Sequence, residues 1–204
     1  MYLVRHGVTA WHADKRVIGH RDVPLSEAGV AQGHEIAATL AHARITEVIS
    51  SPLQRAIQTA EIIGKALHID VARDPRLVDI PAGSLTGLPY SDVAASEAYR
   101  RFFADPHAAP MAGGESLSNI RDRAVAALDQ CLEDSPAGDG ICVVSHAGII
   151  RVLLAHYLGA GPQSYRRLRV APGSISVLEF SGRGEVCRVL AINFVSDLAK
   201  VIYG

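Results

Sequence analysis

The first residues of the chain carry two side chains whose types suit phosphate chemistry. A short apolar run, Tyr2-Leu3-Val4, favours a strand and stops abruptly at Arg5 and His6, after which Gly7 frees the backbone to turn. Such a strand end places a cation and an imidazole at one edge of a sheet, where ligands bind in open α/β folds. A strand whose end merely happens to be polar has the same local pattern, so the rest of the chain must decide.

Two later segments repeat this pattern. Residues 48–50 predict a buried strand, and Ser51-Pro52 predicts the start of a helix, which places Arg55 in the first helical turn. Residues 141–145 predict another buried strand, and His146 follows it directly. Each residue alone has a simpler reading, as a solvated surface arginine or a structural histidine. Two histidines placed alike after buried strands, together with two arginines, favour a functional cluster.

One acid has a position from which it can join this cluster. Residues 74–89 are rich in proline and glycine and predict a structured loop, in which Asp79 ends the segment Arg76-Leu77-Val78-Asp79. Helices alternate with the predicted strands, which indicates a largely parallel sheet with helices on both faces. The strand ends then share one edge, and the loop brings Asp79 toward them.

The chemistry of this cluster suits a phosphoryl group. The planar guanidinium of arginine binds phosphate oxygens in pairs and keeps its charge. A neutral imidazole is a capable nucleophile toward phosphorus, and the remaining cations stabilise the charge on the phosphoryl oxygens. No aspartate-rich cluster and no H-E-x-x-H motif indicates a metal, so neither a metal nor another cofactor is expected.

The elements that position these residues follow from periodicity and turn residues. We expect a loop over 10–25 and an insertion that covers the sheet edge like a lid over about 75–115, within a single domain spanning 1–204. The predicted helices are 27–42 behind Ser26 as N-cap, 52–67, 90–104 before Asp105-Pro106, 116–134 and 147–158. The remaining predicted strands are 69–72, 174–180 and 185–193, with hairpin residues at 181–184 between the last two.

Composition limits the class of protein and its partners. The chain has 204 residues, 49% hydrophobic and 20% charged, with a formal net charge of −1, which argues against a general binder of nucleic acid or anionic membranes. The three cysteines, Cys131, Cys142 and Cys187, are far apart and predict buried thiols in a reducing compartment rather than zinc or redox chemistry.

No secretory signal is expected at the N-terminus, because it lacks a long apolar region and cleavage would remove His6. The apolar stretch 140–160 contains His146, Arg151 and His156, so it fits a buried strand and helix better than a membrane span. The protein is therefore interpreted as cytoplasmic. Its expected partner is a small phosphorylated metabolite, and the sequence leaves a homodimer open.

Several motifs resemble one known family. Leu3-Val4-Arg5-His6-Gly7-Val8-Thr9 resembles the LVRHGxT signature of the histidine phosphatase superfamily, the phosphoglycerate mutase-like proteins. The resemblance continues in Asp22-Val23-Pro24-Leu25-Ser26 with Gly29 and Gln32, in Ser51-Pro52-Leu53-Gln54-Arg55-Ala56 with Thr59-Ala60, in Gly114-Glu115-Ser116 and in Ser145-His146-Ala147-Gly148. It therefore runs through most of the chain, and the motifs together are very specific.

The resemblance implies a three-layer α/β/α sandwich with a mostly parallel central sheet. It also implies that His6 becomes phosphorylated and that Asp79 aligns with the acid of the family, usually Glu, which protonates the leaving oxygen and then activates water. The implied substrate-binding residues are Arg5, His12, Arg55, His146 and Ala147. The sequence departs from the family twice: Asp79 is one methylene shorter than Glu, and His12 stands where many members have Asn.

The leading hypothesis is a metal-independent phosphomonoesterase of the histidine acid phosphatase type, from the phosphatase branch. A phosphoglycerate mutase and a catalytically silent phosphate-binding or regulatory module are the alternatives. The intact set of two histidines and two arginines counts against the silent module. The sequence does not choose among α-ribazole phosphate, phosphoserine, phosphoglycerate and sugar phosphates as substrate.

Overall fold

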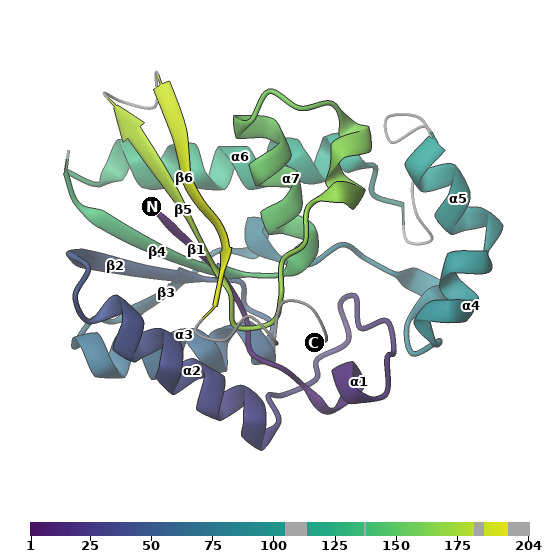
Figure 1. The fold of residues 1–204 in the computed structure, drawn as a ribbon, viewed down its shortest axis with the longest axis horizontal. Coiled ribbons are helices and arrows are strands. Elements are labelled where there is room, and N and C mark those ends of the chain that lie inside the picture. The colour runs from purple at the N-terminus through teal and green to yellow at the C-terminus, as the bar shows by residue number, and fades with distance from the viewer. Residues whose placement is uncertain (105–113, 137, 182–185, 196–204) are drawn as a thin grey trace.

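Six strands form one central sheet in the order β3-β2-β4-β1-β5-β6 (Figure 1). The computed structural model describes residues 1–104, 114–136, 138–181 and 186–195. The strands are β1 (Tyr2–Arg5), β2 (Ile45–Ser50), β3 (Val71–Arg73), β4 (Gly140–Ser145), β5 (Ile175–Ser181) and β6 (Val186–Phe194). The first four run parallel, β5 pairs antiparallel with β1, and β6 pairs antiparallel with β5. The predicted mostly parallel sheet is therefore confirmed.

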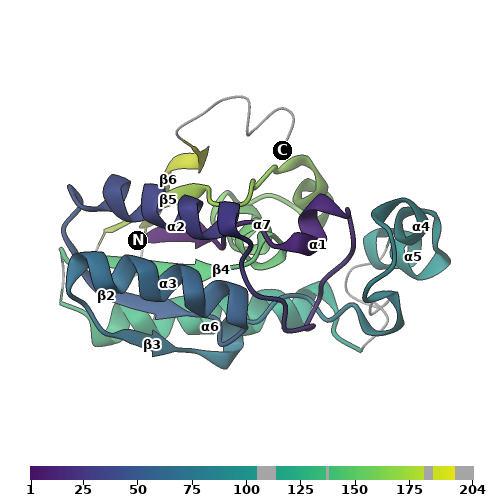
Figure 2. The same ribbon diagram turned by 90° about the horizontal axis from the view of Figure 1, so that it is seen from below.

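Helices cover both faces of this sheet, which gives the three layers expected. The helices α2 (Glu27–Leu40) and α3 (Gln54–Leu67) lie on one face, and α6 (Leu117–Asp134) and α7 (Ala147–Tyr157) lie on the other (Figures 1 and 2). Two separate hydrophobic clusters fill the spaces between the sheet and the two helical layers.

Alternation along the central strands divides their side chains between the two clusters. Leu3 and Val143 pack in the cluster that contains α6 and α7, whereas Val4 and Val144 pack in the cluster that contains α2 and α3. Successive side chains of a strand point to opposite faces, so a strand buried on both faces needs an unbroken apolar run. This burial holds the ends of β1 and β4 in fixed positions.

A close backbone contact positions the loop that follows β1. A Cβ atom on Gly7 would lie 2.5 Å from the carbonyl oxygen of Gly29, and one on Gly29 would lie 2.1 Å from that of Val8. Ser26 caps α2 by accepting from the Gly29 amide at 3.2 Å, and Gln32 accepts from the Val8 amide at 2.8 Å. The start of α2 therefore anchors the segment that carries His6.

Two helix starts differ from the prediction. Residues 10–25 contain one helical turn, α1 (Ala10–Ala13), in which Nδ1 of His12 donates to the Thr9 hydroxyl at 2.9 Å and closes the turn. The helix predicted from Pro52 begins instead at Gln54, since the hydroxyl of Ser51 bonds to the ring of His146. Arg55 still lies in the first turn of α3.

The helix predicted over 90–104 is two helices, α4 (Tyr90–Ala95) and α5 (Glu97–Ala104). Ser96 has an extended backbone between them, and its hydroxyl accepts from the Tyr99 amide at 3.2 Å. Short 3-10 turns occupy Pro75–Leu77, Gly83–Leu85 and Pro162–Arg167. The expected helix end at 105–106 and hairpin residues 182–184 lie outside the described residues.

Residues 75–104, from the first 3-10 turn to the end of α5, belong to the segment that was predicted to act as a lid. Both ribbon views place α4 and α5 beyond the carboxyl ends of the parallel strands (Figures 1 and 2). Val93 of α4 packs with Ala82 and Leu85 in a small hydrophobic cluster of its own. The lid and the single-domain assignment stay predictions.

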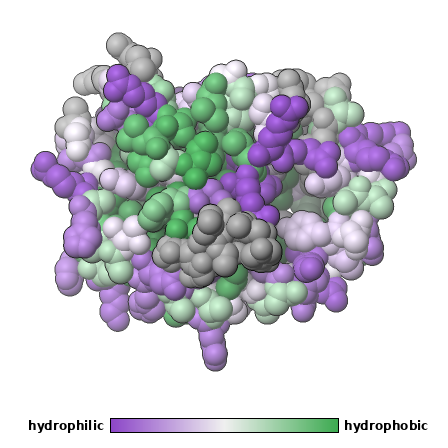
Figure 3. Space-filling view, in the orientation of Figure 1, coloured by the Kyte–Doolittle hydropathy of each residue, from purple (hydrophilic) through white to green (hydrophobic). Residues whose placement is uncertain are grey.

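The edge strand β6 carries exposed apolar side chains at every second position. Leu190, Ile192 and Phe194 are 58%, 39% and 53% exposed, and apolar surface gathers over β5 and β6 (Figure 3). Unpaired edge strands of this kind are places where other proteins pair with a second chain.

Candidate active site

The pairing of β1 with β4 brings the two predicted histidines together. Arg5 pairs with Ser145 in parallel register, and the His6 amide donates to the Ser145 carbonyl at 3.0 Å. The rings of His6 and His146 are consequently 5.1 Å apart between centroids, and both are buried. The convergence at one sheet edge that the sequence predicted is therefore observed.

The ring of His6 is held with one nitrogen ready to act as a base or nucleophile. Its Nδ1 lies 2.7 Å from the carbonyl oxygen of Gly7, which can only accept, so Nδ1 carries the proton. Its Nε2 accepts from Nε of Arg55 at 3.2 Å. Burial, and then the positive charge of Arg55, lowers the pKa of His6 well below its ordinary value. The neutral ring therefore has its lone pair on Nε2.

Arg55 is fully buried beside His6 and is held by the loop after β1. Its Nη1 donates to the carbonyl of Arg21 at 3.0 Å and its Nη2 to that of Gly19 at 2.8 Å. The same Nη2 lies 3.2 Å from Oδ2 of Asp79. Burial lowers the pKa of Arg55, and the neighbouring carboxylate opposes this. The first turn of α3 thus presents a fixed cation to the ring of His6.

Arg5 supplies a second cation, and His12 is its partner. Nη1 of Arg5 donates to the Val170 carbonyl and Nη2 to Nε2 of His12, both at 2.7 Å. Burial lowers the pKa of Arg5 to about 10, so it stays charged at neutral pH. Burial and then Arg5 lower the pKa of His12 to about 3. His12 is therefore a neutral acceptor that orients Arg5, and its contact with substrate stays a prediction.

His146 offers an unpaired nitrogen at the start of a helix. Its Nε2 lies 2.8 Å from Oγ of Ser51, whereas its buried Nδ1 has no hydrogen-bond partner among the described residues. His146 is also the N-cap residue of α7, and its side chain leaves the first amides of the helix uncapped. A helix N-terminus favours an anion, so Ala147 begins a surface suited to phosphate.

Asp79 reaches the same cluster from its loop. Its Oδ2 lies 3.2 Å from Nη2 of Arg55 and 3.8 Å from Nδ1 of His146, and its Oδ1 accepts from the Ile80 amide at 2.9 Å. A Cβ atom on Gly148 would lie 3.0 Å from Oδ1, so the start of α7 must lack a side chain there. Asp79 thus reaches the cluster despite its shorter side chain, and its role as the acid stays a prediction.

The sequence reasoning missed the residues that hold the Asp79 loop. Arg123 of α6 donates from Nη1 to the carbonyls of Arg76 and Val78 and from Nη2 to that of Asp79. Glu115 pairs with Arg123 at 2.6 Å. Because these contacts join segments far apart in the chain, no local pattern could have found them. Glu115 orients Arg123 and does not line the cavity beside His6.

A cavity opens over this cluster. It is lined by predicted site residues, namely Arg5, His6, His12, Asp79 and Ala147, while Arg55 and His146 lie fully buried behind them. Its outer part adds Arg151 and Tyr165, which the sequence did not single out as site residues, and apolar side chains from the loops that flank β1 and Asp79. The cavity accommodates a small phosphorylated molecule with its phosphoryl group against the cations.

Comparisons with known proteins agree with this geometry. Residues 1–193 match the family model described as histidine phosphatase superfamily (branch 1). The chain belongs to the histidine phosphatase superfamily. This histidine phosphatase chain is 37% identical over 182 residues to a protein named probable phosphoglycerate mutase GpmB from Yersinia pestis (strain Pestoides F), a match over 88% of this chain and 84% of that protein.

Solved structures share the fold of this histidine phosphatase chain. YhfR of Bacillus stearothermophilus has a TM-score of 0.86 at 25% identity, over 96% of each chain. A mycobacterial glucosyl-3-phosphoglycerate phosphatase in complex with VO3 has a TM-score of 0.85 at 26% identity, over 95% of this chain and 98% of that one. With a mutase and a phosphatase among its relatives, the chain is supported as a phosphoryl-transfer enzyme.

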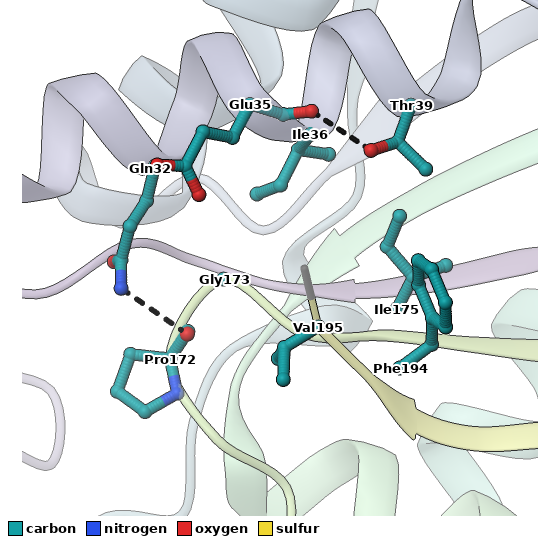
Figure 4. Close-up of a pocket in the computed structure, with 9 residues that line it drawn as sticks. All are labelled: Gln32, Glu35, Ile36, Thr39, Pro172, Gly173, Ile175, Phe194 and Val195. Atoms are coloured by element: carbon teal, nitrogen blue, oxygen red, sulfur yellow. Dashed lines mark hydrogen bonds between the residues drawn. The ribbon is translucent and has the colours of Figure 1, made fainter. Parts of the chain in front are cut away.

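A second hollow in this histidine phosphatase chain lies between α2 and the β5–β6 pair (Figure 4). Gln32 crosses it to donate to the Pro172 carbonyl at 3.5 Å, and Thr39 donates to the Glu35 carbonyl at 2.9 Å. The described residues that line it include neither an arginine nor a histidine. It therefore lacks the groups that phosphate chemistry requires.

Metal-ligating clusters, cysteine thiols and long apolar helices are the other features of this histidine phosphatase chain that bear on its function. Within the described residues, no group of three or more His, Cys, Asp or Glu side chains is arranged to hold a metal ion. Burial raises the pKa of Cys131 to about 11 and that of Cys142 to about 12, so these thiols stay protonated, and Cys187 is half-buried. In the described part of the chain, no helix combines the length and apolarity needed to cross a bilayer.

Proposed function

We propose that the protein is a metal-independent phosphomonoesterase that acts on a small phosphorylated metabolite through a phosphohistidine at His6. The observation that carries this proposal is the neutral ring of His6. Its Nδ1 donates a hydrogen bond to the Gly7 carbonyl, and its Nε2, which has the lone pair, lies 3.2 Å from Nε of Arg55. A nucleophile fixed in this tautomer beside permanent cations suits attack on a phosphoryl group.

The reaction divides into two steps at this site. In the first, Nε of Arg55 transfers its hydrogen bond from Nε2 of His6 to a phosphoryl oxygen, and the freed Nε2 lone pair attacks phosphorus. The bond to the alcohol oxygen breaks, and Asp79 in its protonated form gives that oxygen a proton. In the second, the Asp79 carboxylate takes a proton from a water molecule that attacks phosphorus, and the phosphorus–nitrogen bond breaks. Arg5, Arg55 and His146 surround the phosphoryl oxygens in both steps and stabilise their charge.

Two observations favour a phosphatase over a mutase. The Asp79 side chain is 22% exposed, so water reaches the group that activates it. The mycobacterial relative named above acts as a phosphatase by its name and binds VO3, an analogue of a transferring phosphoryl group. The mutase remains the second candidate, because the relative from Yersinia pestis at 37% identity carries the name of a probable mutase.

The test is a screen of phosphorylated metabolites with the EDTA-treated protein. We expect inorganic phosphate to be released without added metal, and vanadate to inhibit the release. With 3-phosphoglycerate, the appearance of 2-phosphoglycerate is measured beside that of phosphate. Isomer formed faster than phosphate would assign the mutase reaction. A strict requirement for Mg²⁺ or Zn²⁺, or no turnover and no phosphoprotein with any substrate, would contradict the proposal.

A further inference from the structure

Arg151 is a cation of the cavity that the steps described above do not use. It lies on α7 four residues after Ala147, and both residues line the cavity. Residues four apart share one face of a helix, and the rise of about 1.5 Å per residue separates them by roughly 6 Å along the axis. Arg151 therefore faces the same cavity about one helical turn from the expected phosphoryl position.

The charge of Arg151 is not neutralised by the protein around it. Its Nε is buried and has no hydrogen-bond partner among the described residues, and no ion pair within 4.0 Å joins it to a described carboxylate. Buried polar groups normally have a partner, so an unpaired one in a cavity indicates a missing ligand group.

Tyr165 fixes the guanidinium without cancelling its charge. The ring of Tyr165 is 5.7 Å from Cζ of Arg151, a cation–π distance, and the tyrosine itself is buried. Burial raises the pKa of Tyr165 to about 12, so its hydroxyl stays neutral at physiological pH. Arg151 thus lines the cavity beside an uncharged ring and keeps its full positive charge.

Charge balance indicates which anion fits. Arg5, Arg55 and Arg151 contribute three positive charges, and a phosphomonoester contributes two negative charges. Asp79 must be protonated to serve as the acid in the first step, so one positive charge is left over, at Arg151. A carboxylate carries one negative charge and matches the planar guanidinium in two parallel hydrogen bonds.

Part of the cavity lining disfavours polyhydroxylated substrates. Besides Tyr90 and Tyr99, the lining includes five apolar side chains that offer no partner to sugar hydroxyls, namely Ile18, Ile80, Ala82, Leu85 and Val93. A hydroxyl buried against these apolar side chains loses its hydrogen bonds to water without replacement. A short substrate with charges at both ends avoids this cost.

On the basis of the proposed function, we infer that Arg151 binds a carboxylate of the substrate, and that the preferred substrates are short phosphorylated carboxylic acids. In such molecules, a few bonds separate the phosphoryl group from the carboxylate, which matches about one helical turn. Arg151 is in this assignment a specificity-determining residue, whereas His6 and Asp79 perform the chemistry.

The test uses two pairs of substrates that differ at the carboxylate. 3-Phosphoglycerate is compared with glycerol 3-phosphate, and O-phosphoserine with O-phosphoethanolamine, by kcat/KM. We expect the acid of each pair to be preferred by about 10–100-fold, the range of a charge-assisted hydrogen bond. Arg151→Gln should reduce this ratio to near one, mainly through KM of the acid, and Arg151→Lys should retain part of it. Arg188→Gln, on the exposed β6, is the matched control.

The outcomes separate this inference from the proposed function. If Arg151→Gln slows both members of a pair equally, or if wild type prefers neither, the carboxylate assignment is wrong even when a phosphohistidine forms. If no phosphohistidine forms with any substrate, the proposed function fails. The inference is then still decided by the dissociation constants of 3-phosphoglycerate and glycerol 3-phosphate for the His6→Ala variant. Equal constants would overturn it, and a ratio that Arg151→Gln abolishes in that background would support it.

Discussion

Nε of Arg55 lies 3.2 Å from Nε2 of His6, so one guanidinium fixes the orientation of the Nε2 lone pair. The same group reaches Oδ2 of Asp79 through Nη2, also at 3.2 Å. Arg55 therefore holds His6 and Asp79, the proposed nucleophile and acid, at a fixed separation before substrate binds. A phosphoryl group that arrives between them can accept from the guanidinium with little rearrangement of the protein.

Removal of the nucleophile should stop turnover without unfolding the protein. His6→Ala is expected to lose essentially all phosphatase activity and to yield no acid-labile phosphoprotein when substrate is added and the mixture is quenched in alkali. His34→Ala, on the exposed side of α2, is the matched control and should behave as wild type. Normal activity in a folded His6→Ala protein would remove the proposed mechanism.

The acid should matter most when the leaving group is poor. Asp79→Asn preserves shape but cannot transfer a proton, so kcat on alkyl phosphates should fall by about 10²–10⁴-fold. The fall on p-nitrophenyl phosphate should be much smaller, because p-nitrophenolate leaves without protonation. A folding or binding defect would slow both substrates alike. Equal losses, or none, would show that Asp79 is not the acid, while Asp79→Glu should retain activity on alkyl phosphates.

Arg123 is expected to act on catalysis by positioning the Asp79 loop. Its guanidinium bonds three carbonyls of that loop, so Arg123→Gln should lower kcat on alkyl phosphates more than on p-nitrophenyl phosphate, as Asp79→Asn does but to a smaller extent. Arg121→Gln, an exposed neighbour on α6, serves as control. If Arg123→Gln only lowered the melting temperature and left the ratio of the two rates unchanged, the residue would be purely structural.

Acid should destabilise the protein through its buried histidines. The pKa of His12 is about 3 in the folded state against an ordinary 6.5, and those of His6 and His146 are also lowered by burial. As the pH falls below 6.5, the unfolded chain binds protons first, so stability is greatest above that pH and is lost toward pH 3. His12→Asn should reduce the slope of the free energy of unfolding against pH by up to about 1.4 kcal/mol per pH unit. Urea unfolding at several pH values measures this slope for wild type and variant. Equal slopes for the two proteins would show that His12 does not contribute to the loss of stability in acid.

The sequence predicted those parts of the site that depend on local pattern. Apolar runs that end in a charged or imidazole side chain located His6 and His146, and a parallel sheet then required them to meet at one edge. The proline- and glycine-rich loop indicated Asp79 in the same way. These predictions succeed because strand burial and chain alternation leave little freedom to the ends of central strands.

The parts that sequence reasoning missed depend on contacts between distant segments. Nothing near Arg123 in the chain reveals the three carbonyls it binds, and nothing near Arg151 reveals the ring of Tyr165. The start of α3 was placed too early because the pattern Ser51-Pro52 is a typical helix start, whereas the Ser51 hydroxyl bonds to His146. Local propensity gives way here to a tertiary hydrogen bond.

The position of β1 between β4 and β5 has a consequence for synthesis of the chain. Tyr2 pairs with Cys142 on one side and with Val177 on the other, so the strand that precedes His6 finds both of its neighbours much later in the sequence. Pairings over such separations form slowly and late. During synthesis β1 must therefore wait, unpaired, until β4 and β5 have followed. A nascent protein arrested before β5 would hold every predicted catalytic side chain and still lack the strand that completes the support of His6.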